Sequence, residues 1–374
     1  MSAVEHSSDM LREYQSFAER VQALLRSDTQ WRTTYAGYAA ELLKKKDEMA
    51  EKRGALGSQS KLDPLYCYTS IGAIKGGRGF DFDLRYLGQS VGTITVKNGT
   101  PLLTVDAKKA ADSQKYFGYD VGKISGGDWN TGAQARAFKA YYKSLTDQAD
   151  MFPRQKEHMV ESALFTELGK EQGAAKALKG IQPITCVDGV RLHMKTALFA
   201  SKSIWEDPTL SKDGGGGEID VFCRRRSGNR SRLTVIEVKD ENKKSETFHL
   251  AIKQAIAYAI FVRELARSRS GPDWMGLWGL GNQPWENGFT INAVAAMPKG
   301  TTSRFPFAGM LIARITAEIS IEKERLKAAL KAGRQKPWPT GITPVGQFFL
   351  SVACYVVKPK RPNFKCREKY GKQK

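Results

Sequence analysis

Two short apolar-rich runs, each with an acidic residue in its interior, constrain the fold of this chain more than any other feature. The first run, Glu218–Cys223, has Asp220 near its middle. The second, Leu233–Val238, is rich in β-branched residues and has Glu237 just before its end. Because β-branched residues favour strands, two such runs around the polar segment Arg224–Ser231 predict a β-hairpin.

The pattern within the hairpin suggests chemistry. Side chains alternate across a strand, so Glu237 and Lys239 share one face and Val238 lies on the other. If the strands pair, Asp220 lies next to Glu237, and two adjacent carboxylates repel each other unless a cation joins them. Oxygen ligands of this kind suit Mg²⁺ or Mn²⁺. Lys239 is then placed to orient an attacking water or to stabilise charge on a phosphate.

Helices are predicted on both sides of the hairpin. Downstream, residues 245–267 have helical periodicity, and the spacing of Gln254 and Tyr258 puts both on one helix face. Upstream, residues 157–168 also read as a helix. Glu161 falls there on an otherwise apolar stripe, and Glu157, one turn earlier, is the rival candidate.

The ordered set of Asp220, Glu237-x-Lys239 and the helix with Gln254 and Tyr258 resembles the PD-(D/E)xK nuclease superfamily, and its QxxxY motif resembles the RecB-like members. The resemblance covers about residues 150–300. It implies an α/β protein with a restriction-endonuclease-like αβββαβ core, a mixed sheet and metal-dependent cleavage of phosphodiester bonds. One departure is that isoleucine, not proline, precedes Asp220.

The resemblance also implies roles for individual residues. Asp220, Glu237 and the carbonyl of Val238 are the expected metal ligands, and Glu161 completes or supports that shell. Lys239 is expected to position or activate water. Gln254 and Tyr258 on the following helix are expected to position the site or the DNA.

The charge of the chain points to the substrate. Its 59 Lys and Arg residues exceed its 39 Asp and Glu residues, which gives a net charge of +20 and favours a polyanionic partner such as nucleic acid. Basic residues that flank the hairpin are candidates for phosphate contacts, and a solvated hairpin tip is the alternative reading. They are Arg224, Arg225, Arg226, Lys243 and Lys244.

Composition also restricts the setting. No apolar run is long enough to span a membrane, and the N-terminus lacks a signal-peptide pattern. The five cysteines form no CxxC pair, which favours reduced thiols over a zinc site or a disulfide framework. We therefore expect a cytoplasmic protein without a membrane partner.

Three regions are expected along the chain. Residues 1–150 form a helical hairpin, over 8–27 and 29–52, and a β-rich module for recognition or oligomerisation. Residues 151–357 form the nuclease-like domain, with a further helix over 307–331. Residues 358–374 are a basic tail.

Asn98-Gly99 predicts a tight hairpin turn.

Three other local features allow two interpretations each. Asp81 and Asp83 form either a second acidic site or a solvated strand face. An aromatic stripe in the second helix favours core packing over base stacking, and so do three later tryptophans. These aromatic residues are Trp31, Tyr35, Tyr38, Trp274, Trp278 and Trp285.

These patterns together predict a Mg²⁺- or Mn²⁺-dependent DNA endonuclease. By family analogy it acts in restriction or anti-phage defence, and cutting both strands calls for a homodimer or higher homo-oligomer. The alternatives are a nucleic-acid-binding protein that keeps the fold without cutting, and a scaffold or assembly protein.

Overall fold

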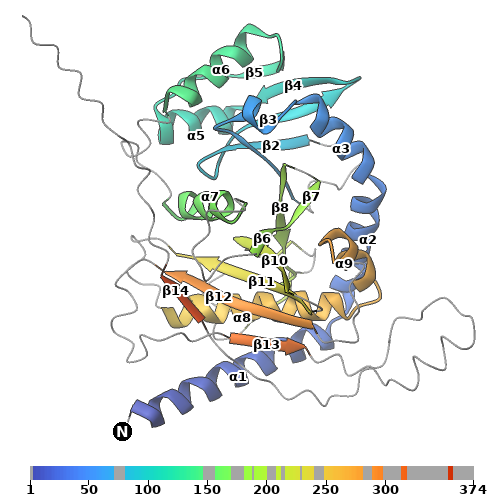
Figure 1. Cartoon of the computed structure of the whole chain (residues 1–374), viewed down its shortest axis with the longest axis vertical. Coiled ribbons are helices and arrows are strands. Elements are labelled where there is room, and N and C mark those ends of the chain that lie inside the picture. The colour runs from blue at the N-terminus through green and yellow to red at the C-terminus, as the bar shows by residue number, and fades with distance from the viewer. Residues whose placement is uncertain are drawn as a thin grey trace, which may run out of the picture.

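The computed structural model has two β-sheets with helices around and between them (Figure 1). It describes residues 3–70, 81–145, 156–169, 181–187, 189–199, 208–211, 215–227, 230–239, 248–280, 289–297, 313–317 and 353–356. The predicted basic tail lies outside the described residues. None of the described helices is both long enough and apolar enough to cross a membrane.

The elements have the following bounds. The helices are α1 (Ala3–Ser27), α2 (Gln30–Lys44), α3 (Lys46–Ala55), α4 (Gln59–Leu62), α5 (Ala107–Phe117), α6 (Ala133–Ser144), α7 (Lys156–Gly169), α8 (Phe248–Ala266) and α9 (Gly271–Leu277). The strands are β1 (Tyr66–Ser70), β2 (Asp81–Tyr86), β3 (Gln89–Lys97), β4 (Thr100–Val105), β5 (Ile124–Asp128), β6 (Ile181–Pro183), β7 (Thr185–Val187), β8 (Val190–Lys195), β9 (Glu218–Ile219), β10 (Val221–Ser227), β11 (Arg230–Val238), β12 (Phe289–Met297), β13 (Ala313–Ala317) and β14 (Ala353–Val356).

The larger sheet combines an antiparallel meander with short strands from the middle of the chain. Its order is β5-β4-β3-β2-β1-β8-β7, and β9 also pairs with β8. Asn98 and Gly99 connect β3 to β4 with φ of 50° and 74°, the left-handed geometry that a tight hairpin turn requires. This confirms the predicted turn. β1 pairs in parallel with β8, so one sheet contains strands from both sides of the domain boundary expected near residue 150.

The smaller sheet contains the predicted hairpin. Its order is β13-β12-β11-β10-β6, with β14 paired to β12. β10 and β11 are antiparallel, with Val221 opposite Ile236, which confirms the hairpin. The strands are longer than predicted, because β10 continues to Ser227 and β11 begins at Arg230. The polar turn predicted over 224–231 is therefore mostly strand. The arginines in this segment show only that it is polar. A polar segment can be a loop or the solvent-facing end of a long hairpin, so composition did not distinguish the two.

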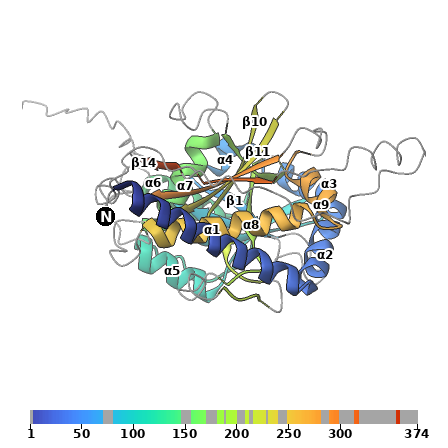
Figure 2. The same ribbon diagram turned by 90° about the horizontal axis from the view of Figure 1, so that it is seen from below.

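Helix α8 lies between α1 and the smaller sheet (Figure 2). Every residue from Ala251 to Ala266 is buried, as expected for a helix covered on all sides. From α2, Trp31 and Tyr35 pack on Phe261 with ring centroids 5.3 and 4.9 Å away. Trp274 and Trp278 are buried as well. The core interpretation of these aromatic residues is thus confirmed, while Trp285 lies outside the described residues.

Two predicted helices differ from the structure. The helix expected over 29–52 is divided at Lys45, whose φ of −96° and ψ of 3° lie outside the helical range, into α2 and α3. The prediction of a helix over 307–331 is wrong for the residues that the structure describes there, because Ala313–Ala317 is a strand. This strand pairs antiparallel with β12, and such long-range pairing overrides a local helical pattern.

Helix α7 lies between the two sheets (Figure 1). Its Leu164, Phe165 and Leu168 belong to a buried cluster that includes Val221 and Ile236 of the hairpin. The first turn of α7 therefore lies beside the start of β10 and the end of β11, where the predicted acidic residues are found.

Candidate metal centre

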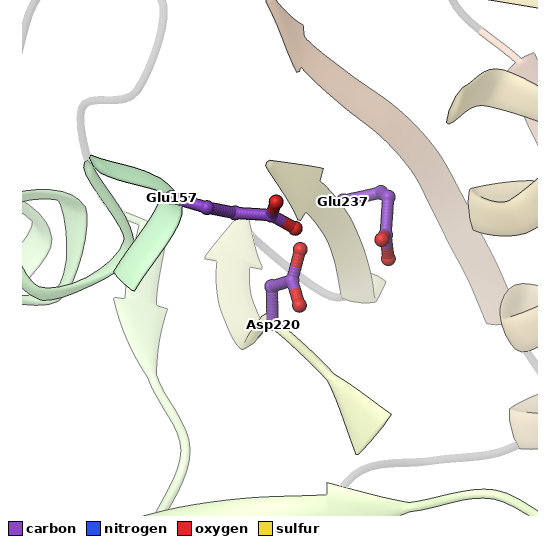
Figure 3. A group of neighbouring side chains, drawn as sticks. All are labelled: Glu157, Asp220 and Glu237. Atoms are coloured by element: carbon purple, nitrogen blue, oxygen red, sulfur yellow. The ribbon is translucent and has the colours of Figure 1, made fainter. Parts of the chain in front are cut away.

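Three carboxylates from three separate elements converge at one end of the β10–β11 hairpin (Figure 3). Glu157 is in the first turn of α7, Asp220 is at the bend before β10, and Glu237 is the penultimate residue of β11. One oxygen of each lies within 4.8 Å of the others. We call these three residues the acidic cluster.

The hairpin register explains why two of the carboxylates meet. Val221 is opposite Ile236, so the next positions outward are Asp220 and Glu237. Directly opposed residues in an antiparallel pair project from the same face, with their Cβ atoms about 4.5–5.5 Å apart. The predicted proximity of Asp220 to Glu237 is confirmed.

Lys239 provides a positive charge beside the acidic cluster. Its Nζ lies 2.8 Å from Glu237 Oε1 and 3.4 Å from Glu157 Oε1, and the side chain is 4% exposed. The face shared by Glu237 and Lys239 was predicted from strand alternation and is confirmed. Burial alone lowers the pKa of an ammonium group, but Glu237, Asp220 and Glu157 outweigh it, so the pKa of Lys239 is raised. Lys239 is therefore a hydrogen-bond donor in this structure and not a base.

The backbone also contributes to the arrangement. The N–H of Val238 donates a 2.7 Å hydrogen bond to Asp220 Oδ2, which fixes the carboxylate relative to β11. Val238 was expected to contribute its carbonyl to a metal, and the contact that the structure gives it at this site is made by its N–H.

The acidic cluster has more negative charge than its surroundings neutralise. Burial raises the pKa of Asp220 to about 7, and the charge of Glu161 adds to the effect. Burial also raises the pKa of Glu237 well above its ordinary value, with repulsion from Asp220 as the next cause. Glu237 Oε2 is buried and has no hydrogen-bond partner among the described residues.

These properties fit a divalent cation. Three carboxylates face one ammonium, so two negative charges remain when all are ionised. An unpartnered buried carboxylate oxygen is costly unless a ligand satisfies it. An all-oxygen donor set suits Mg²⁺ or Mn²⁺ better than the softer metals. The residues that can hold such an ion are Glu157, Asp220 and Glu237.

Glu161 was expected at the metal, with Glu157 as the rival, and the structure gives Glu161 other partners. Its Oε2 lies 3.4 Å from His158 Nδ1 and its Oε1 lies 3.2 Å from His193 Nε2. Burial alone raises the pKa of this carboxyl, but the hydrogen bonds with both histidines outweigh burial and lower it to about 2. Glu161 is thus an ionised, fully hydrogen-bonded residue one turn away from the acidic cluster.

His193 links Glu161 to the larger sheet. Its Nδ1 lies 2.9 Å from Glu218 Oε2, and Arg85 Nη1 lies 3.2 Å from its Nε2. Arg85 in turn pairs with Asp83 at 2.8 Å. We call Glu161, His193, Glu218, Arg85 and Asp83 the histidine network. It joins α7, which carries Glu157, to β9, which leads into Asp220.

The sequence reading missed this network. Alternation in β8 puts Val190, Leu192 and Met194 on one face of the strand. It leaves Arg191 and His193 together on the other face, and this pair of polar residues could have indicated the network. Asp83 proves to be an ion-paired residue of the network. Asp81 is exposed and its carboxylate accepts from Thr95 Oγ1, which agrees with the strand-face interpretation.

Gln254 and Tyr258 lie beneath the site on α8. Gln254 Nε2 is 3.3 Å from the Tyr258 hydroxyl, and both side chains are buried. Burial raises the pKa of Tyr258 well above its ordinary value, and the charge of Glu237 is the next cause, so this hydroxyl is close to the acidic cluster. Tyr258 was expected to position the site or the DNA, and because its side chain is fully buried it does not contact DNA in this structure.

The predicted phosphate-binding residues are only partly described. Arg224 Nη1 donates a 2.9 Å hydrogen bond to the carbonyl of Trp278, so this guanidinium faces the fold. The backbone of Arg225 and Arg226 is in β10, and their side chains lie outside the described part of the structure. Lys243 and Lys244 lie outside it entirely.

No protein-family model, no curated protein and no solved structure matches the chain significantly.

Proposed function

We propose that this protein is a metal-dependent deoxyribonuclease that hydrolyses phosphodiester bonds within DNA. The observation that carries the proposal is the convergence of Glu157, Asp220 and Glu237 within 4.8 Å, with the buried Lys239 ammonium beside them. Carboxylates can hold a divalent ion that polarises a phosphate, and an adjacent ammonium can stabilise the charge that develops on it.

The order of elements supports the proposal. A helix, three strands, a helix and a strand follow one another as α7, β6, β10, β11, α8 and β12, if the strands of the larger sheet and the short helix α9 between α8 and β12 are set aside. This is the αβββαβ order that the resemblance to PD-(D/E)xK nucleases implies. β10 and β11 are antiparallel, and α8 connects β11 to its parallel neighbour β12, which gives the mixed sheet expected of that core.

Each residue of the site has a chemical role in the proposal. Glu157, Asp220 and Glu237 would hold the cation, which would supply Lewis acidity for attack on the phosphate. Lys239 stays protonated and donates a hydrogen bond to the attacking water or to a phosphate oxygen. The Val238 N–H holds Asp220 in place, and Gln254 and Tyr258 form the buried support beneath Glu237.

The substrate class follows from charge. A chain with a net charge of +20 attracts nucleic acid strongly, and this attraction weakens as salt releases the condensed counterions. DNA is the substrate we propose, with restriction or anti-phage defence as the setting by family analogy. A homodimer or higher homo-oligomer then provides the second active site for cutting both strands.

A substitution in the acidic cluster should abolish both metal binding and DNA cleavage. We expect wild-type protein to bind Mn²⁺ in a calorimetric titration and to nick or linearise plasmid DNA with Mg²⁺. Asp220→Asn should lose both. Glu51→Gln removes an exposed carboxylate on α3 and should change neither.

The same experiment distinguishes the alternatives. DNA binding that persists in EDTA, with no Mn²⁺ binding and no cutting of supercoiled, linear or single-stranded DNA, would mean a binding protein that keeps the fold without catalysis. Absence of salt-sensitive DNA binding would favour a scaffold protein.

A further inference from the structure

A second candidate site lies in the N-terminal part of the chain. A cavity of about 610 Å³ opens among α3, α4, the turn that follows β5, and α6, and its lining shares no residue with the acidic cluster. Three lysines line it, Lys61 from α4 and Lys139 and Lys143 from α6, against one acidic residue, Asp63. Its volume is in the range of small-molecule sites in proteins, about 300–1,000 Å³.

Among the described residues, the three ammonium groups have no acidic partner. None of the three lysines forms an ion pair with an acidic side chain in the part of the chain that the structure describes. Lys139 and Lys143 are one helical turn apart, so their like charges face the same side of α6 and repel each other. The lining therefore has an excess of two positive charges, which an anion in the cavity would offset.

Lys139 is held in place before any ligand arrives. Its Nζ donates a 2.7 Å hydrogen bond to the carbonyl of Trp129 and lies 4.5 Å from the centre of the indole ring. Trp129 is itself buried, and its backbone N–H donates a 2.8 Å hydrogen bond to the carbonyl of Pro101. An ammonium has three donors, so Lys139 keeps donors free for a ligand.

The electrostatics of the cavity agree with this geometry. Burial lowers the pKa of Lys139, and the positive charges of Arg136 and Lys61 lower it further, although Asp128 opposes them. Lys61 thus acts on Lys139 across the cavity although the two belong to different helices. Positive charge is concentrated there and is incompletely balanced by the protein.

We propose that this cavity binds a phosphate group, carried either by a small phosphorylated molecule or by a nucleic-acid backbone. A phosphate offers several strong acceptor oxygens and more than one negative charge, which suits several convergent ammonium donors better than a single carboxylate does. Lys139 covers the Trp129 ring, so the ring is not open to a stacking base. Recognition is therefore by charge and independent of base identity.

The test uses the full chain in EDTA, which keeps it separate from metal binding and cleavage at the acidic cluster. Three probes are titrated: inorganic phosphate, the mononucleotide AMP and a single-stranded oligonucleotide. The Lys61→Gln/Lys143→Gln double variant removes two exposed cavity charges. The Lys97→Gln/Lys108→Gln double variant removes two exposed charges elsewhere and is the matched control.

We expect the cavity variant to bind at least one probe about tenfold or more weakly than wild type, since each lost charge-assisted hydrogen bond costs about a factor of ten. The control should stay within about twofold of wild type, as expected for distant charges screened by salt. Loss for phosphate and AMP identifies a small phosphorylated ligand. Loss for the oligonucleotide alone identifies a nucleic-acid backbone.

The proposal is overturned if wild type binds none of the three probes, or if both double variants weaken binding equally. Equal weakening would mean that only net charge matters. The melting temperatures of both variants should match that of wild type, because all four lysines are exposed. Lys143→Arg, which keeps the charge, should restore most of the affinity that Lys143→Gln loses.

Discussion

Glu157 and Glu161 occupy successive turns on one face of α7, yet their carboxylates belong to different groups. Glu157 is part of the acidic cluster, while Glu161 is hydrogen-bonded to His158 and His193. One helical turn advances the chain by about 5.4 Å, which separates the expected metal site from the histidine network.

This separation predicts different effects for two matched substitutions. Glu157→Gln should weaken Mn²⁺ binding by at least about tenfold, since even outer partners of metal ligands contribute about 10- to 100-fold. Glu161→Gln should change the affinity less but lower the free energy of unfolding by about 2 kcal/mol, because buried His193 loses one of its two carboxylate partners and keeps only Glu218. Calorimetry with Mn²⁺ and urea unfolding of each variant measure the two quantities. A larger loss of Mn²⁺ affinity in Glu161→Gln would reverse the assignment.

The stability of the metal-free protein should fall as pH rises from about 4 to about 7. The pKa of Asp220 is raised from 3.8 to about 7 in the folded protein. The stabilisation that results from this shift is therefore fully present below the unfolded pKa and is lost as pH rises through the folded pKa. At full ionisation the cost is on the order of 4 kcal/mol. Glu237 shifts in the same direction.

Urea unfolding in EDTA across this pH range measures the effect. The difference between wild type and Asp220→Asn isolates the contribution of Asp220 and of its repulsion of Glu237, because carboxylates outside the acidic cluster titrate equally in both proteins. Saturating Mg²⁺ should abolish the decline, since a bound cation stabilises the ionised form. A wild-type profile parallel to that of Asp220→Asn would show that the Asp220 pKa is not raised.

Lys239→Met should separate metal binding from chemistry. The variant keeps the length and apolar stem of the side chain but removes the ammonium that lies 2.8 Å from Glu237 and 3.4 Å from Glu157. We expect DNA cleavage to fall by about 100-fold or more, as for the loss of one preorganised donor. Mn²⁺ affinity should be kept or increased, because a competing positive charge is gone. Reduced Mn²⁺ affinity together with unchanged cleavage would contradict this role for Lys239.

Local patterns were sufficient to predict two of the three carboxylates of the acidic cluster, Asp220 and Glu237. Strand alternation put Glu237 and Lys239 on one face, and the hairpin put Asp220 beside them. Both depend only on residues within about 20 positions of each other. Helical periodicity likewise identified the buried aromatic stripe with Trp31 and Tyr35.

The remaining features depend on long-range packing, which no local pattern encodes. Glu157 and Glu161 share a helix face, so only the position of α7 against the hairpin decides which of them reaches Asp220. His193 meets Arg85 because β1, adjacent to β2, pairs in parallel with β8. This pairing joins segments more than 100 residues apart, and nothing in either segment specifies it.

Two histidines should titrate in opposite directions from the ordinary value of 6.5. Burial alone lowers the pKa of His193, but hydrogen bonds with Glu161 and Glu218 outweigh it and raise the pKa. Burial lowers the pKa of His249, and the charge of Lys253 lowers it further, although Glu13 opposes both. The imidazole resonances of the four histidines, followed by NMR against pH in EDTA, measure both midpoints.

The variants His193→Gln and His249→Gln assign the two resonances by their absence. With a raised folded pKa, the stabilisation from His193 is complete below pH 6.5 and is lost as pH rises through its folded value. Glu161→Gln should therefore move the His193 midpoint down and leave that of His249 unchanged. A His193 midpoint at or below 6.5 in wild type would mean that the histidine network does not hold a charged imidazole between α7 and β9, and that another contact sets the distance from Glu157 to Asp220.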